Sequence, residues 1–302
     1  MIRSSKGDRV FDGVNIFLLL LLTIVVAYPL YFVVIASISS PAAVNFGEVW
    51  FWPKSINFTG YTFVFKDEQL WRGYLNTIIL TLVGTSVNLL CTFTGAYALT
   101  KTHLPLIRAC MFIFTFTMFF GGGLIPTYIL VSSLHLRNTL WAMILPGAVS
   151  VYNLILVRTY FMKSIPEEIL DAARIDGCSD MKLFIRIILP LAKPIIATMA
   201  LFYGVGHWNQ FFAALIYISD ESKYPLQLVL RNLLLMGNTA MTNMINSGGG
   251  SVEEAKYISE LMQRAEILKY AVIIVSTLPV LIVYPFLQKY FMKGIMAGSL
   301  KG

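Results

Sequence analysis

The sequence predicts an all-α membrane protein with six transmembrane helices and with both termini in the cytoplasm. The 302 residues are 57% hydrophobic and 13% charged, a balance that would make a water-soluble chain of this length prone to aggregate. Six apolar runs are long enough to cross a bilayer of about 30 Å, which requires about 20 helical residues. Basic residues gather in alternate loops, which sets the orientation.

The apolar runs place the six spans along the chain. The first run is too long for a signal-peptide core and is followed by no small-x-small cleavage site, so we expect a retained helix. Glycines 121–123 ahead of Pro126 predict that the third helix is broken, and prolines in other runs predict kinks. The expected spans are residues 14–38, 74–100, 107–131, 140–157, 187–218 and 270–287.

We expect a single transmembrane domain over residues 1–302. Residues 1–73 would form the first span and an outer loop, and residues 74–302 a core that contains a cytoplasmic segment, 164–190. The outer segments 39–73 and 219–269 either receive an external partner or pack on the bundle as connectors. In the second of them, Ser251 and Glu254 predict a capping box and a helix that leads directly into the last span.

The net charge of +7 follows from this topology. Basic residues outnumber acidic ones in the cytoplasmic segments, whereas the two balance in the outer loops. The charge therefore requires no nucleic-acid partner. Cys91, Cys110 and Cys178 form no pattern that predicts a disulfide framework or a metal site.

Ionisable residues are scarce within the expected spans, where Lys193 and His207 are the main ones. Proton- and sodium-coupled carriers need such groups at membrane depth, so the energy for transport must come from elsewhere, or the protein is a passive pore. His207 could line a translocation path, although a histidine hydrogen-bonded between helices is the commoner arrangement.

The cytoplasmic segment 164–190 predicts a helical elbow. Ser164 and Glu167 form a capping-box pattern, Pro166 suits a first turn, and Gly177 suits a left-handed stop. The expected helix has about a dozen residues and is about 18 Å long. A second helix is expected from Ser179 or Asp180 toward the fifth span. The apolar face of the first helix is predicted to hold Ile169, Ala172 and Ala173. Its charged border is predicted to hold Glu168, Asp171 and Arg174.

Periodicity alone favours an ordinary surface helix here, but the spacing of particular residues resembles the EAA loop of binding-protein-dependent ABC importer permeases. Aspartate stands where that family most often has glutamate, which keeps the carboxylate on a shorter stem. The positions that carry the resemblance are Asp171, Ala172, Ala173, Gly177, Ile187, Leu189 and Pro190.

The resemblance covers nearly the whole chain. The five spans from residue 74 are similar to the five-helix core of type I importers, and the extra N-terminal span is similar to the shorter permease of the maltose type. Residues 207–215 and 224–227 are similar to carbohydrate-importer permeases, especially those for complex oligosaccharides.

The resemblance implies a multi-pass permease subunit in the bacterial inner membrane, embedded in lipid. It would translocate an oligosaccharide delivered by an extracellular solute-binding protein, together with two ATP-binding subunits and a second, non-identical permease. ATP and Mg would bind the partner subunits, since this chain has no Gly-Lys dipeptide and so no phosphate-binding loop of the Walker type.

No catalytic or metal-binding residue is expected in this chain. The resemblance implies that the helix at 165–176 docks in a cleft on an ATPase and transmits force. The residues implied in ATPase coupling are Glu167, Glu168, Asp171, Ala172, Ala173, Arg174, Asp176, Gly177, Leu189 and Pro190. Residues that could bind sugar by amide hydrogen bonds or aromatic stacking, or could simply pack the bundle, are Asn76, Asn88, Asn153, Tyr203, His207, Trp208, Asn209 and Gln210.

Two other readings stay open at the level of sequence. One is an ABC permease for another solute, such as a peptide or polyamine. The other is a passive channel or structural membrane subunit, in which the cytoplasmic segment would be a surface helix. A membrane-embedded enzyme is disfavoured, because no His, Asp, Glu or Cys cluster has catalytic or ligand spacing.

Overall fold

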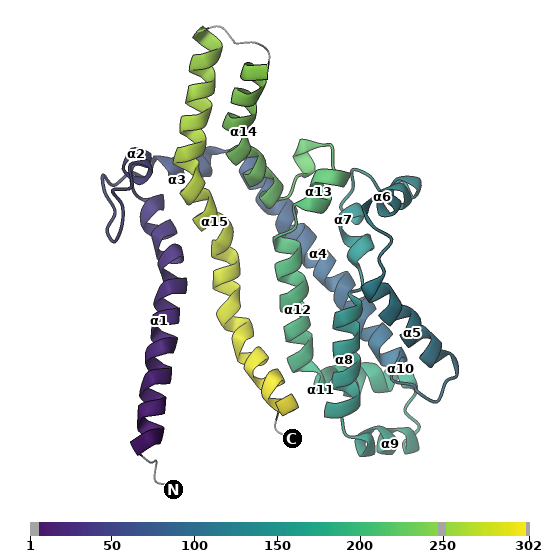
Figure 1. Ribbon diagram of the computed structural model, residues 1–302. Helices are drawn as coiled ribbons and strands as arrows, with labels where there is room; N and C mark the ends of the chain where they lie inside the picture. Colours follow the sequence, from purple (N-terminus) through teal and green to yellow (C-terminus); the bar gives the residue numbers. More distant parts are fainter. Residues whose placement is uncertain (1–5, 247–251, 300–302) are drawn as a thin grey trace. The chain divides into compact units, whose positions relative to one another are not determined.

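The computed structural model describes residues 6–246 and 252–299, and all regular secondary structure within those ranges is helical (Figure 1). Three helices there contain stretches long and apolar enough to cross a membrane unbroken. These helices are α1 (Lys6–Ser37), α4 (Glu68–Ala98) and α15 (Val252–Ser299).

Three bent pairs of helices are further candidates for spans. The first pair, α5 (Leu106–Phe119) with α6 (Leu124–Ser133), bends by 115°. In the second pair, Trp141–Gly147 and α8 (Val151–Ser164) meet at 54°. The third bent pair is described below. Six spans, as the sequence predicts, result only if each bent pair counts as one span.

The break in the third span is confirmed. Phe119 ends α5 and Leu124 begins α6, and between them Gly123 has a φ of +85°, which L-residues with a side chain rarely adopt. The run of glycines therefore separates two helices that the apolar pattern alone would have joined.

The kink predicted at Pro194 in the fifth expected span, 187–218, is confirmed, and the span is also interrupted a second time, before α13. Residues Asp180–Leu191 and α12 (Lys193–Trp208) meet at 81° around Ala192, and α13 (Phe212–Tyr217) is a separate short helix. Pro194 lies in the first turn of α12, where its missing N–H has no helical acceptor, so it suits a helix start and not a helix interior.

The chain forms two compact units. In the unit formed by residues up to 67 and 231–278, the first outer segment is folded and not extended. It contains α2 (Pro41–Asn45) and α3 (Thr59–Lys66), and the Tyr61 hydroxyl lies 2.7 Å from Ser37 Oγ at the end of α1. Helix α15 runs without interruption from residue 252, as expected, whereas the predicted cap Ser251 lies outside the described residues.

The other unit, residues 68–230 with 279 onward, is built around α4, which packs against α12 and α8. Its main core joins these helices to segment 164–190 in one cluster. The remaining elements of this unit are α7 (Trp141–Ile144), η1 (Leu145–Gly147), α9 (Glu167–Ile175), α10 (Asp180–Leu183), η2 (Phe184–Ile188), α11 (Leu189–Leu191), η3 (Glu221–Lys223) and the start of α14 (Leu226–Asn246). The main core cluster of this unit includes Phe93, Ala96, Leu99, Leu154, Val157, Phe161, Ala173, Leu183, Phe184, Met199 and Tyr203.

A close approach between α4 and α12 depends on Gly84. A Cβ added at this position would lie 2.5 to 2.8 Å from ring atoms of His207. The imidazole is 9% exposed, and its Nε2 lies 2.6 Å from Asn88 Oδ1, so the ring has no room to move aside. The two helices can therefore cross at this distance only because residue 84 has no side chain.

We expect Gly84→Ala to lower the free energy of unfolding by about 1–3 kcal/mol, because the new methyl group overpacks the crossing. The measurement is thermal unfolding of the purified protein in detergent. Gly206→Ala in α12 is the matched control, since a Cβ there meets no atom within 4 Å. Equal melting temperatures for the two variants would contradict the role given to Gly84.

Candidate functional site

Helix α9, which the sequence places in the cytoplasm, begins later than predicted. The helix spans Glu167–Ile175, nine residues, and its N-cap is Pro166 without a side-chain cap. The capping box predicted from Ser164 is wrong, because Ser164 is the last residue of α8. Ile165 precedes a proline, which disfavours the helical region, and its backbone is extended (φ −101°, ψ 116°). Helix α8 therefore ends at Ser164.

The predicted left-handed stop at Gly177 is confirmed. Its φ is +71°, its N–H donates to the Arg174 carbonyl at 3.0 Å, and the Cys178 N–H donates to the Ala173 carbonyl at 3.0 Å. This pair of bonds is the Schellman arrangement, which satisfies the carbonyls at a helix end. The chain turns there and begins α10 at Asp180, with Ser179 as its N-cap.

The two predicted face alanines of α9 point in different directions. Ala173 is 8% exposed and packs in the main core, whereas Ala172 is exposed. The placement of Ala173 on the outward face is therefore wrong, because the helix is anchored to its own bundle through this residue. The exposed face instead includes Ile175, whose side chain is 87% exposed and which the sequence analysis had missed.

Charged residues of α9 flank this exposed face. Asp171 accepts a hydrogen bond from Arg174 at 2.7 Å, so the shorter carboxylate is engaged within the helix. Glu167 and Glu168 lie in the first turn, where negative charge interacts favourably with the helix dipole. Glu168, Asp176 and Gly177 are exposed, whereas Leu189 and Pro190 lie in α11, just before the bend at Ala192.

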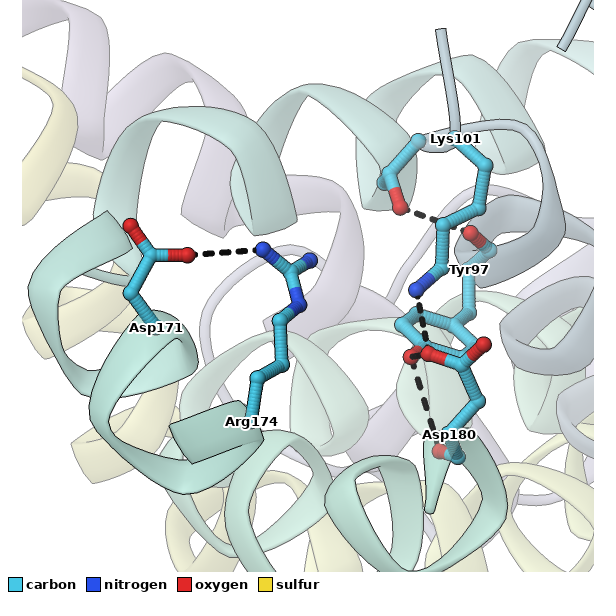
Figure 2. A network of polar contacts seen from close by, with 6 residues as sticks. Tyr97, Lys101, Asp171, Arg174 and Asp180 are labelled. Atoms are coloured by element: carbon cyan, nitrogen blue, oxygen red, sulfur yellow. Dashed lines mark hydrogen bonds and ion pairs between the residues drawn. The ribbon is translucent and has the colours of Figure 1, made fainter. Parts of the chain in front are cut away.

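A second polar cluster joins α10 to the end of α4 (Figure 2). Lys101 donates to Asp180 Oδ1 at 2.5 Å, and the Tyr97 hydroxyl donates to the same oxygen at 3.1 Å. The Lys101 ammonium also lies 4.8 Å from the centre of the Tyr97 ring. The hydrogen bonds from Lys101 and Tyr97 lower the pKa of the Asp180 carboxyl, so it is ionised at neutral pH. Residues 101 and 180 are far apart in sequence, and no local pattern predicts their pairing.

A polar cavity of about 670 Å³ lies between this cluster and α9. Its walls include Lys101 and Asp180 on one side and Glu167, Leu170 and Arg174 of α9 on the other. The charges around the cavity are of mixed sign, and apolar side chains such as Phe161 and Leu183 complete its walls.

The predicted substrate-path residues are mostly engaged in bonds within the bundle. Asn88 donates to the carbonyls of Gly147 and Ala148, both at 2.9 Å, and its Oδ1 contacts His207. Since both amide hydrogens of Asn88 are committed, His207 Nε2 is the donor in that contact. Gln210 donates to the Met143 carbonyl at 3.1 Å. The structure thus brings Asn88, His207 and Gln210 together, close to the break between η1 and α8 and to the end of α12.

The other predicted path residues are spread over the same unit. The Tyr203 hydroxyl lies 2.7 Å from Thr92 Oγ1, and Asn76 donates to the Ser222 and Tyr224 carbonyls. Asn153 is buried at the start of α8, and Trp208 is buried with its ring 6.1 Å from that of Tyr74. Asn209 is exposed and donates to the Val205 carbonyl of its own helix.

An apolar cavity of about 430 Å³ lies beside Trp208, lined by α4, α12 and α15. The hydroxyls of Thr81 and Thr85 line it and have no hydrogen-bond partner within the described ranges. Within those ranges, no group of three His, Cys, Asp or Glu residues could hold a metal ion.

Comparisons with known proteins agree with one another. The model of the family "Binding-protein-dependent transport system inner membrane component" matches residues 1–297. Protein LplC of Bacillus subtilis (strain 168) is 41% identical over 299 residues, 99% of this chain and 97% of the relative. The polygalacturonan/rhamnogalacturonan transport system permease protein YtcP of the same organism is 36% identical over 295 residues, 98% of this chain and 99% of the relative.

A solved structure is also similar over almost the whole chain. It is the crystal structure of a bacterial ABC transporter involved in the import of the acidic polysaccharide alginate. The TM-score is 0.82 at 34% sequence identity, and the match covers 96% of this chain and 100% of the other. The arrangement of helices described above is therefore shared with a chain of a known transporter.

The stop at Gly177 generates a prediction for α9. Gly177→Val should raise the hydrogen-exchange rate of the amides of residues 176–178 about tenfold, because a side chain in the left-handed region costs about 1–2 kcal/mol. Gly177→Asn is the matched control, since asparagine tolerates that region, and its exchange should stay close to that of the parent protein. Equal protection of these amides in the valine variant and the parent would contradict the assignment.

Proposed function

Because the chain belongs to the family of binding-protein-dependent transport system inner membrane components, we propose that it is the permease subunit of an ATP-driven ABC importer for an oligosaccharide. The observation that carries the proposal is helix α9, which buries Ala173 against its own bundle and exposes its other face. The named relatives support the substrate class, since YtcP is a permease for polysaccharides and the similar structure is an alginate importer.

The exposed face of α9 is the proposed ATPase contact. This face holds Glu168, Ala172 and Ile175. The protruding apolar side chain of Ile175 and the small side chain of Ala172 are therefore flanked by charge. Such a surface fits a partner cleft that contacts the helix closely at Ala172 and takes up the Ile175 side chain. When two ATPase subunits close around ATP and Mg, they would displace α9 and, through α10 and α11, the bent helix α12.

The remaining members of the assembly follow from the family. We infer two ATP-binding subunits, a second and non-identical permease, and an extracellular solute-binding protein. This chain supplies no ATP site of its own, because its sequence has no Gly-Lys dipeptide for a phosphate-binding loop. Its residues transmit force and shape the path but perform no chemistry.

Asn209 is the substrate-path residue that we retain for direct contact with the sugar. Its side chain is exposed, and an amide can pair with two sugar hydroxyls. Asn76, Asn88, Tyr203, His207 and Gln210 are engaged in bonds within the bundle and are proposed to shape the path. Trp208 and Asn153 are buried, and we assign them to the same supporting group.

The orientation is proposed from charge. With both termini in the cytoplasm, the elbow lies inside and residues 39–67 lie outside. In intact cells, a membrane-impermeant thiol reagent should label a cysteine placed at Lys54 and spare one placed at Lys163. The background variant has its three native cysteines replaced by serine. Labelling of the Lys163 position without cell lysis would reverse the topology and end the proposal.

The function is tested in vesicles that contain this permease, its partner permease and the two ATPases, with the binding protein outside. We expect ATP-dependent accumulation of oligosaccharide, and no ATP hydrolysis by the purified chain alone. A series of neutral and acidic oligosaccharides identifies the preferred class, with a peptide and a polyamine as competing solutes. Accumulation that needs no ATP, or ATPase activity of the isolated chain, would overturn the proposal.

A variant on α9 separates an importer from a passive channel. Ala172→Leu should abolish accumulation because the longer side chain blocks close contact with the ATPase, while leucine costs the helix little. Ala109→Leu in α5 makes the same change at another exposed alanine and should leave uptake unchanged. A channel would keep its flux in both variants.

A further inference from the structure

The cytoplasmic end of α4 is bonded to both helices that flank α9. On one side, Arg158 of α8 donates through Nε to the Leu99 carbonyl at 2.8 Å. On the other side, Lys101 and Tyr97 donate to Asp180, the first residue of α10. Because α9 lies in the chain between α8 and α10, a displacement of α9 acts on bonds that converge at one end of α4.

The contact with Asp180 is preorganised from the side of α4. The Lys101 side chain is only 15% exposed, whereas that of Asp180 is 70% exposed. The Tyr97 ring beneath the ammonium stacks on Phe184 with ring centres 4.9 Å apart and an interplanar angle of 20°. Lysine and tyrosine are therefore already held in place where Asp180 meets them, as Figure 2 shows.

The electrostatics of the contact keep it charged at neutral pH. Burial lowers the pKa of the Lys101 ammonium, but its hydrogen bonds with Asp180 and Tyr97 outweigh burial and raise it. The pKa of Asp180 is lowered by the same bonds. Both partners therefore carry full charge at the pH at which the protein works.

We propose that Lys101, Tyr97 and Asp180 form a clamp that carries the movement of the elbow into α4, as a route additional to the covalent one through α11 into α12. The three are positioning residues, and the inference rests on the proposed function as an ATP-driven importer. The clamp would make α4 move with α10 whenever an ATPase displaces α9.

The backbone geometry of the two routes favours transmission of the movement through the clamp into α4. The covalent route passes through the π-helical turn Phe184–Ile188 and an 81° bend at Ala192, features that make a compliant joint. Helix α4 is unbroken over 31 residues. An unbroken helix that is bonded near its end transmits a displacement with less loss than a segment that contains a bend and an irregular turn.

Helix α4 also has contacts that would pass the movement on. Asn88 bonds the backbone at Gly147 and Ala148, ahead of α8, and contacts His207 of α12. Thr92 bonds Tyr203, also of α12. A shift of α4 would therefore reach the proposed solute path at residues 203–210 by a route that does not use the bend at Ala192.

The test measures oligosaccharide accumulated per ATP hydrolysed in vesicles with the complete complex. Lys101→Met and Asp180→Asn should each lower this ratio roughly two- to fivefold, the factor expected for loss of one partly exposed ion pair. ATP hydrolysis itself should persist, because α9 still binds the ATPase. Tyr97→Phe keeps the ring stacking and loses one hydrogen bond, so its effect should be smaller.

The double variant Lys101→Asp with Asp180→Lys should recover most of the ratio, because it restores the ion pair with reversed charges. Lys182→Met is the matched control, since it removes the same charge from an exposed position in the same turn as Asp180. A ratio equal to that of the parent complex in both single variants, or no recovery in an assembled double variant, would overturn the clamp. If the parent complex accumulates nothing with ATP, the proposed function itself fails.

Discussion

Polar groups inside a membrane must find their partners within the protein, and the structure of this chain depends on how α4 meets that requirement. One face of the helix bears a series of polar side chains. Thr77 accepts a hydrogen bond from the Leu226 backbone N–H, Asn88 bonds two carbonyls, and Thr92 pairs with Tyr203. Each partner belongs to another segment, so satisfying α4 brings the segments of its unit together.

The same requirement explains how broken helices persist in the bundle. A break frees backbone carbonyls that lipid cannot satisfy. Asn88 donates to two carbonyls at the end of η1, those of Gly147 and Ala148. Gln210, which follows α12, donates to the Met143 carbonyl in α7. These amides therefore stabilise irregular backbone within the bundle.

Charge is concentrated where α4 leaves the expected membrane region, and there it connects separate helices. Lys101, Asp180, Arg174 and Asp171 form two neighbouring ion pairs around one polar cavity (Figure 2). One pair lies within α9, and the other joins α10 to the end of α4. Helix α9 buries only Ala173 in the main core, whereas the segment that follows it buries Leu183 and Phe184 there.

The sequence by itself determined the helical membrane class, the location of the apolar runs, the break at residues 121–123 and the turn at Gly177. These follow from composition, length and backbone chemistry, which are local properties. The tertiary structure decided which face of α9 is buried and that Lys101 meets Asp180. Such facts depend on residues far apart in the chain. Ala172 and Ala173 are adjacent and of the same type, so the sequence does not tell them apart. Only the packing of α9 against its own bundle buries Ala173 and leaves Ala172 exposed.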